Sequence, residues 1–142
     1  MAMVLNDPSM YEFTGGSPPT ESQLRDRYHH LAVGWSPDRS ERWCNWVVRT
    51  HADPQALGAV QATVWADRAQ VAWEVGPPWQ GRGVATEAAG AVLVWLLTEG
   101  VTVVEATIHP EHAASQRVAE RIGLRATLEE DDGEVVWRLP RA

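Results

Sequence analysis

Residues 69–108 constrain the fold more than any other part of the chain, because they read as a strand, a glycine-rich turn, a helix and a second strand. The first strand is "AQVAWEV" (69–75) and the second is "VTVVEATI" (101–108). Between them, residues 85–99 repeat apolar side chains at the spacing of an amphipathic helix, and Gly100 ends it. A unit of this length is typical of a right-handed crossover, which joins two parallel strands of one sheet.

Further elements flank this unit. In chain order they are a helix after Thr20, strands at 42–50 and 56–66, a helix at 113–122, and a hairpin of "LRATLEE" and "EVVWRL". Thr20 and Gln23 form a capping box, and Asp132-Gly133 forms the hairpin turn. Short turns between the first three strands predict an antiparallel meander. We therefore expect one α+β domain over residues 1–142, built on a mixed sheet.

Composition excludes several classes of function. The chain has 142 residues and a formal net charge of −7, which argues against a general nucleic-acid binder. All 12 basic residues are arginine, so a phosphate-binding loop of the lysine type and a Schiff-base enzyme are both excluded. The single cysteine, Cys44, permits no intrachain disulfide. No apolar run approaches the ~20 residues of a membrane span, and the N-terminus has no signal pattern. We expect a cytoplasmic protein without a membrane partner.

The turn after the first strand of the crossover has the properties of an anion site. Gly81 and Gly83 remove side chains where the backbone enters the helix. The N–H groups of residues 81 to 86 have no earlier carbonyl partners, and the positive end of the helix dipole lies behind them. For a bare Gly-x-Gly, a tight turn without a ligand is the favoured interpretation. A dinucleotide fingerprint fits poorly, because its third glycine would fall at Thr86.

Two motifs together resemble the GNAT superfamily of acyl-CoA-dependent N-acyltransferases. "QGRGVA" (80–85) fits the pattern [Q/R]-x-x-G-x-[G/A] between a strand and a helix, and "HPEHAASQRVAERIGL" (109–124) follows one strand later. More narrowly, the chain is similar to the branch that includes ribosomal-protein-alanine N-acetyltransferases. The resemblance is firm over residues 69–128 and looser over residues 11–66.

The resemblance implies a twisted, mostly antiparallel sheet with helices on both faces and a V-shaped splay between two central parallel strands. It implies acetyl-CoA as cosubstrate and no metal. The residues that would bind the coenzyme are Trp73, Val75, Gln80, Gly81, Arg82, Gly83, Val84, Ala85, Thr86, His112 and Ser115. The loop would hold the pyrophosphate, and residues 73–75 would pair with the pantetheine arm like an added strand. The Val75 N–H would face the thioester oxygen, and Ser115 would lie near the sulfur.

The sequence departs from the family pattern at two places. His112 stands where the family usually has asparagine, which caps a helix and bonds the pantetheine. Only "MAMVL" precedes Asn6-Asp7-Pro8, so we expect the usual first strand to be short or absent.

The general base has two candidates. Glu74 lies on the strand expected to grip the pantetheine, and it shares a face with the small residues Ala72 and Gly76. The alternative for Glu74 is a solvated carboxylate facing away from the site. His109 is the second candidate; its alternative is a histidine that only bonds backbone before Pro110.

For several other features we favour a structural role over a functional one. His109-x-x-His112 lacks supporting metal ligands at a recognised spacing. Cys44 lies on a predicted strand, where a lone cysteine usually packs in the core. Trp35 and Trp79 lie in loops and are better pocket candidates than the other tryptophans. Acidic residues crowd the last hairpin, where they form a charged turn or attract a cationic acceptor.

We therefore predict an acetyl-CoA-dependent N-acetyltransferase that acts on a primary amine, either a peptide N-terminus or a small molecule. A non-catalytic acyl-CoA-binding module is the alternative, and a different small anion in the loop is a third reading. A homodimer is compatible with this prediction. The sequence leaves the acceptor unidentified.

Overall fold

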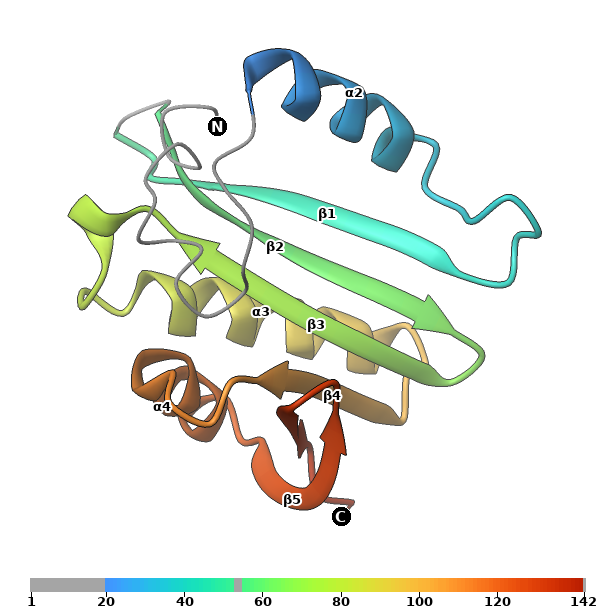
Figure 1. Cartoon of the computed structure of the whole chain (residues 1–142), viewed down its shortest axis with the longest axis vertical. Helices are drawn as coiled ribbons and strands as arrows, with labels where there is room; N and C mark the ends of the chain where they lie inside the picture. Colours follow the sequence, from blue (N-terminus) through green and yellow to red (C-terminus); the bar gives the residue numbers. More distant parts are fainter. Residues whose placement is uncertain (1–19, 53–54, 142) are drawn as a thin grey trace.

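The computed structural model describes residues 20–52 and 55–141, and in this part of the chain six strands form one sheet in the order β1-β2-β3-β4-β6-β5 (Figure 1). The strands are β1 Arg42–Arg49, β2 Ala56–Trp65, β3 Arg68–Val75, β4 Val103–Ile108, β5 Arg125–Asp131 and β6 Glu134–Arg138. The helices are α2 Glu21–Ala32, the short 3-10 helix η2 Pro77–Trp79, α3 Val84–Thr98 and α4 Ala113–Arg121.

The pairing confirms the expected mixed sheet. β1, β2 and β3 form an antiparallel meander, and β4, β6 and β5 are also joined by antiparallel pairs. β3 and β4 are parallel, as the crossover through α3 requires. The chain is thus an α+β protein with one parallel pair at the centre of its sheet.

Local sequence signals explain several of these elements. The Thr20 N–H donates to Gln23 Oε1 over 2.9 Å, and the Gln23 N–H donates to Thr20 Oγ1 over 3.1 Å, which completes the capping box at the start of α2. In the β5–β6 turn, Asp132 and Gly133 have φ angles of 50° and 80°. Two successive left-handed residues are what a tight hairpin of the right twist needs.

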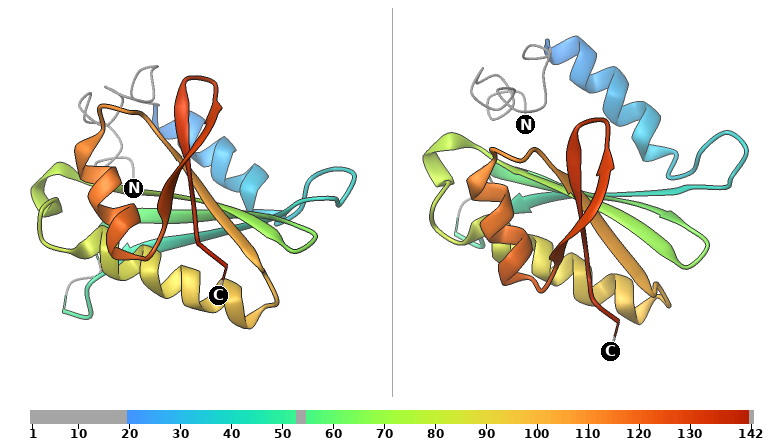
Figure 2. Two further views of the ribbon diagram at one scale, coloured as in Figure 1. Left: turned by 90° about the horizontal axis from the view of Figure 1, so that it is seen from below. Right: turned by 60° about the horizontal axis from the view of Figure 1, so that its bottom comes forward.

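The helices cover both faces of the sheet. Figure 2 shows α2 on one face and α3 with α4 on the other. The main apolar core lies between the sheet and α3, because β2, β3 and β4 each present alternate apolar residues to that side. Its most deeply buried members are Val60, Ala69, Leu96, Val104, Ala119 and Leu124.

β3 and β4 separate part of the way along their length. Their ladder runs from Arg68 opposite Val103 to Gln70 opposite Glu105, but β3 continues to Val75 and β4 to Ile108. Figure 1 shows the two strands diverging toward their C-terminal ends. Each strand is held instead by its outer neighbour, β3 by β2 and β4 by β6. This divergence is the expected V-shaped splay.

β4 begins later than the sequence pattern predicted. The N–H groups of Thr102 and Val103 both donate to the Asp67 carbonyl, over 2.8 and 3.2 Å, so the chain leaving α3 is first fastened to the β2–β3 turn. The strand pattern expected from residue 101 therefore starts at Val103. The expected short or absent first strand falls within residues 1–19, outside the described residues.

Candidate functional site

The glycine-rich loop leaves an open space above the start of α3. Gly81 and Gly83 have φ angles of 76° and 78°, in the left-handed region where glycine carries no steric penalty. A Cβ atom built on either residue would meet nothing within 4 Å. Gly83 is the N-cap of α3 and supplies no side-chain cap. The first N–H groups of the helix therefore face open space, which is the arrangement that binds an anion.

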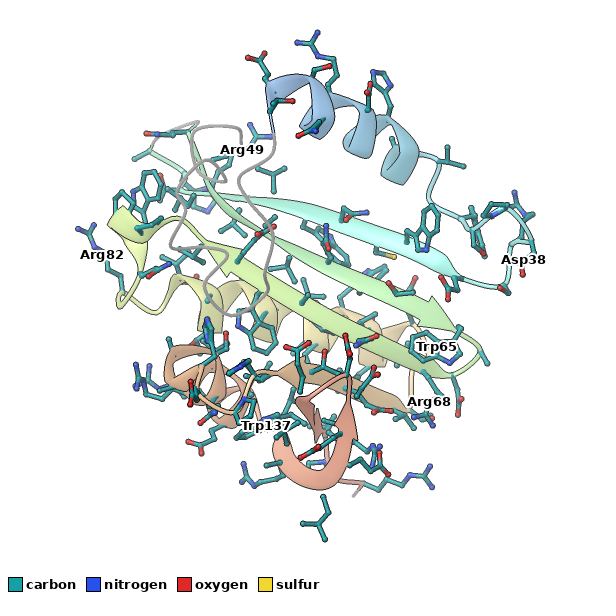
Figure 3. All side chains as sticks on the ribbon, in the orientation of Figure 1. Asp38, Arg49, Trp65, Arg68, Arg82 and Trp137 are labelled. Carbon is teal, nitrogen blue, oxygen red and sulfur yellow. The ribbon has the colours of Figure 1, made fainter. Side chains whose placement is uncertain are left out.

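Arg82 lies between these glycines and is exposed. In Figure 3 its side chain extends outward from the loop rather than toward the sheet. The guanidinium therefore lies outside the loop.

The backbone of Val75 faces the V between β3 and β4. The Gly76 N–H donates to the Leu57 carbonyl of β2 over 2.8 Å. Because N–H groups along a strand alternate between its two neighbours, the Val75 and Trp73 N–H groups point the other way, toward β4. The β4 ladder ended at Gln70, so this edge of β3 is presented to the V.

Gln80 connects the loop to this same strand end. Its Nε2 donates to the Val75 carbonyl over 2.8 Å. The carbonyl therefore also points away from β2, in agreement with the orientation of the Val75 N–H. The sequence pattern assigned Gln80 to the coenzyme loop but did not indicate this bond.

The side chains of β3 alternate as expected. Val75 is buried, at 8 % exposure, and Trp73 packs against the apolar core on the α3 side. Glu74 lies on the opposite face of the sheet, is half-buried, and shares that face with the exposed Ala72. Opposite this point β2 carries Gly58, where a Cβ would come within 2.1 Å of the Glu74 carbonyl oxygen. The close approach of the two backbones at this end of the sheet thus requires glycine.

The second motif forms the start of α4. His112 is its N-cap, and its Nδ1 accepts the Ser115 N–H over 3.0 Å. The histidine therefore performs the capping task that the family gives to asparagine. Ser115 lies in the first turn and is half-buried. Because β3 and β4 are parallel, the loop after β3 and this turn after β4 lie at the same end of the sheet (Figure 1).

His109 is engaged in its own turn. Its Nδ1 accepts the Glu111 N–H over 3.1 Å. A neutral imidazole whose Nδ1 accepts a hydrogen bond carries its proton on Nε2, so the nitrogen with the lone pair is engaged within the turn.

The remaining candidates have structural surroundings. Burial raises the pKa of the Cys44 thiol, which is half-buried on β1 and packs against the core. Trp35 is covered by the Arg39 guanidinium 4.8 Å from its ring centre, whereas Trp79 lies in η2, half-buried.

Among the described residues, no group of three or more His, Cys, Asp or Glu could hold a metal ion. No helix in residues 20–52 and 55–141 is long and apolar enough to cross a membrane.

Sequence reasoning missed an ion-pair network at the other end of β3 and β4. Glu105 of β4 pairs with Arg68 of β3 and, over 3.2 Å, with Arg138 of β6. Arg138 also pairs with Glu129 of β5 over 2.5 Å, and the hydrogen bonds that it donates to Glu129 and Glu105 raise the pKa of its guanidinium. The only sequence signal was a single charge, Glu105, inside an otherwise apolar strand.

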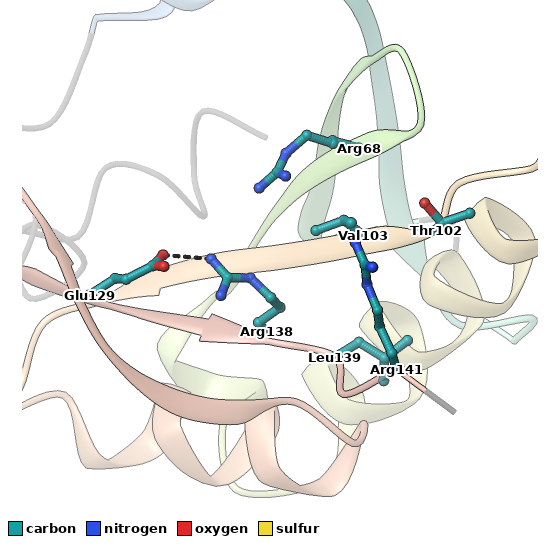
Figure 4. Close-up of a pocket in the computed structure, with 7 residues that line it drawn as sticks. All are labelled: Arg68, Thr102, Val103, Glu129, Arg138, Leu139 and Arg141. Atoms are coloured by element: carbon teal, nitrogen blue, oxygen red, sulfur yellow. Dashed lines mark hydrogen bonds and ion pairs between the residues drawn. The ribbon is translucent and has the colours of Figure 1, made fainter.

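This network forms part of the wall of a cavity of about 440 Å³. Its lining residues, drawn in Figure 4, are Arg68, Thr102, Val103, Glu129, Arg138, Leu139 and Arg141. The cavity lies where β3 and β4 begin, whereas the glycine-rich loop follows the end of β3. Glu129, one of the acidic residues of the last hairpin, thus forms an ion pair with Arg138 on the neighbouring strand.

Comparisons with known proteins agree with this geometry. The family model described as an acetyltransferase (GNAT) domain matches residues 1–125. No curated protein matches the chain.

Solved structures share the fold at low sequence identity. An acetyltransferase of the GNAT family from Bacillus anthracis is 19% identical with a TM-score of 0.77, over 97% of this chain and 85% of that one. The aminoglycoside acetyltransferase AAC(6')-Ib in complex with coenzyme A is 18% identical with a TM-score of 0.76, over 99% and 86%. A Vibrio cholerae protein provisionally named a ribosomal-protein-serine acetyltransferase is 17% identical with a TM-score of 0.69, over 84% and 75%. Since the family model spans most of the sequence and the fold agrees, the chain belongs to the GNAT acetyltransferase domain family.

Proposed function

We propose that the protein is an acetyl-CoA-dependent N-acetyltransferase that moves an acetyl group to a primary amine by direct attack on the thioester. The observation that carries the proposal is the pairing of two features at one end of the sheet. The first is the open, uncapped start of α3 at Gly83, and the second is the Val75 backbone turned into the V. The start of α3 suits the pyrophosphate of the coenzyme, and the Val75 backbone suits the pantetheine arm and the thioester that follow it.

The loop holds the charged end of the coenzyme. The N–H groups of residues 81–86 bind the pyrophosphate, and Arg82 adds a positive charge beside them. The free edge of β3 at residues 73–75 hydrogen-bonds the pantetheine arm, because β4 no longer pairs with it there. These contacts orient the donor before the acceptor arrives.

The transfer step needs an oxyanion donor, a base and a route for the thiolate. Acetyl-CoA supplies an activated carbonyl with a good leaving group. The Val75 N–H stabilises the negative charge that develops on the carbonyl oxygen during attack. Glu74 removes a proton from the ammonium directly or through one water, and Ser115 donates a hydrogen bond to the departing sulfur.

Glu74 is the stronger candidate for the base. It lies on the face of the sheet away from α3, with exposed Ala72 beside it on the same strand, so an amine has room to approach. His109, in contrast, uses Nδ1 to accept the Glu111 N–H. With the base on this face, the sheet itself separates the acceptor from the apolar core on the α3 side.

The face that carries Glu74 suits a polar acceptor. Registered strand pairs place amides and hydroxyls on it, namely Asn45 opposite Gln61, and Thr63 opposite Gln70. Gln70 Nε2 lies 3.4 Å from Thr107 Oγ1 across the point where the ladder ends. AAC(6')-Ib has been solved with coenzyme A and kanamycin, so aminoglycosides belong among the acceptors to be tested beside peptide N-termini and polyamines.

The test is chromatographic conversion of acetyl-CoA to coenzyme A across an amine panel at alkaline pH, where the free amine is abundant and the need for a base is small. Amine-dependent conversion supports the proposal. Coenzyme binding without conversion by any amine would instead identify a non-catalytic binding module.

With an acceptor in hand, Glu74→Gln tests the base. We expect turnover at neutral pH to fall by roughly a hundredfold or more, with the deficit shrinking as pH rises. Glu120→Gln, an exposed carboxylate on α4, is the matched control and should leave turnover unchanged. Full neutral-pH activity in Glu74→Gln would remove Glu74 from the mechanism.

A further inference from the structure

We propose that Gln80 is a positioning residue that sets the Val75 N–H for the transfer step, instead of a ligand for the coenzyme phosphates. This inference rests on the function proposed above. It deepens that function by coupling the phosphate loop to the group that stabilises the oxyanion.

The backbone of Val75, the last residue of β3, faces the V. The Gly76 N–H is bound to Leu57 of β2 over 2.8 Å, so both the N–H and the carbonyl of Val75 point toward β4. The β3–β4 ladder stops five positions earlier, at Gln70. Neither group of Val75 is therefore held by a neighbouring strand.

Gln80 adds a constraint on the edge of β3 that faces the V. Its Nε2 donates to the Val75 carbonyl over 2.8 Å, which is the length of a good hydrogen bond. The Val75 carbonyl lies in the Val75–Gly76 peptide and the Val75 N–H in the Glu74–Val75 peptide. A bond that fixes the carbonyl therefore restrains the N–H through the backbone angles of Val75, which join the two peptide planes. An oxyanion donor is effective only when it is aimed before the charge develops.

Gln80 connects η2 to β3. Its backbone N–H donates to the Pro77 carbonyl over 3.3 Å and ends η2, directly before Gly81. Its side chain reaches back to β3. An anion that orders the loop at Gly81 and Gly83 therefore also holds the Val75 peptide, so binding at one end of the coenzyme prepares the chemistry at the other.

The experiment separates binding from turnover in three variants. Gln80→Met keeps the length of the side chain but loses the donor, whereas Gln80→Arg keeps N–H donors that reach the same carbonyl. Thr127→Val is the matched control, because the Thr127 hydroxyl makes the same kind of bond, over 2.7 Å, to the Val136 carbonyl between β5 and β6, away from the site. Coenzyme A affinity is measured by calorimetry, and kcat is measured with saturating acetyl-CoA and amine.

We expect Gln80→Met to lower kcat by about tenfold or more while the Kd for coenzyme A stays within about threefold of wild type. Gln80→Arg should recover most of kcat, and Thr127→Val should keep it. A loss of coenzyme affinity with kcat unchanged would overturn the inference and make Gln80 a phosphate ligand. An unchanged kcat and Kd, or parallel losses in both parameters, would overturn it as well.

A readout without turnover keeps this test independent of the proposed function. Loss of the bond to the Val75 carbonyl should shift the amide nitrogen resonance of Gly76, which shares that peptide group, and Gln80→Arg should shift it back. An unmoved Gly76 resonance in Gln80→Met contradicts the bond itself. Wild-type protein that neither binds coenzyme A nor transfers acetyl groups would refute the proposed function. The Gly76 resonance tests the bond from Gln80 in either case.

Discussion

Replacement of Gly83 by alanine separates two roles of this glycine, its backbone conformation and the space above it. Gly83 has a φ of 78°, and a Cβ would meet no atom within 4 Å. The variant therefore creates no clash inside the protein, and its cost to folding is the left-handed conformation alone, about 1–2 kcal/mol. The methyl group instead occupies the space where the proposed pyrophosphate approaches the first N–H groups of α3.

The expected effect on binding is larger than the effect on folding. Displacing the pyrophosphate enough to lose one hydrogen bond to a charged group costs about 1.5–3 kcal/mol, which weakens the affinity by about ten- to a hundredfold. Thermal unfolding without ligand measures the first effect, and calorimetric titration with coenzyme A measures the second.

Gly133→Ala is the matched control. Gly133 has a φ of 80°, and its Cβ would also meet nothing within 4 Å, but it lies in the β5–β6 turn. Both variants should lose similar stability, and only Gly83→Ala should lose coenzyme affinity. A folded Gly83→Ala protein that binds coenzyme A as tightly as Gly133→Ala would refute the assignment of the loop.

Two further predictions concern local bonds. His112→Ala should destabilise the protein by about 0.5–2 kcal/mol in chemical unfolding because α4 loses its N-cap, while His112→Asn should retain most of the stability through an amide oxygen; equal losses in the two variants would contradict the cap. Hydrogen bonds from the Ser40 hydroxyl, the Ser40 N–H and the Ser36 hydroxyl lower the pKa of Asp38 to about 2. The folded-state pKa lies below the unfolded value, so this contribution to stability is present above about pH 4 and is lost as pH falls toward 2. Asp38→Asn should therefore flatten the acid dependence of the unfolding midpoint over that window, and an unchanged slope would argue against it.

Local signals in the sequence were sufficient for much of the fold. The Thr20–Gln23 box and the Asp132-Gly133 turn depend on neighbours within three positions, so their residues alone predict them. The parallel pair followed from the length of the crossover. The late start of β4 did not, because it depends on Asp67, which is distant in sequence from Thr102.

The candidate site was predictable only as positions along the chain. The two motifs gave the chain positions of the glycine loop and of the first turn of α4, which the structure brings to one end of the sheet. The point where β3 and β4 part depends on β2 and β6 holding them, which no motif encodes. The bond from Gln80 to Val75 joins a loop to a strand, and the pairing of Glu105 with Arg68 joins two strands. Both are tertiary contacts that no local pattern of residues predicts.

A titration of isotope-labelled protein with coenzyme A, followed through backbone amide resonances, tests the central claim most directly. The account predicts saturable shifts at residues 80–86, at residues 73–75 and in the first turn of α4, with the β5–β6 turn unmoved. Absence of shifts, or shifts confined to the cavity beside Arg68 and Arg138, would contradict the placement of the coenzyme and with it the proposed chemistry.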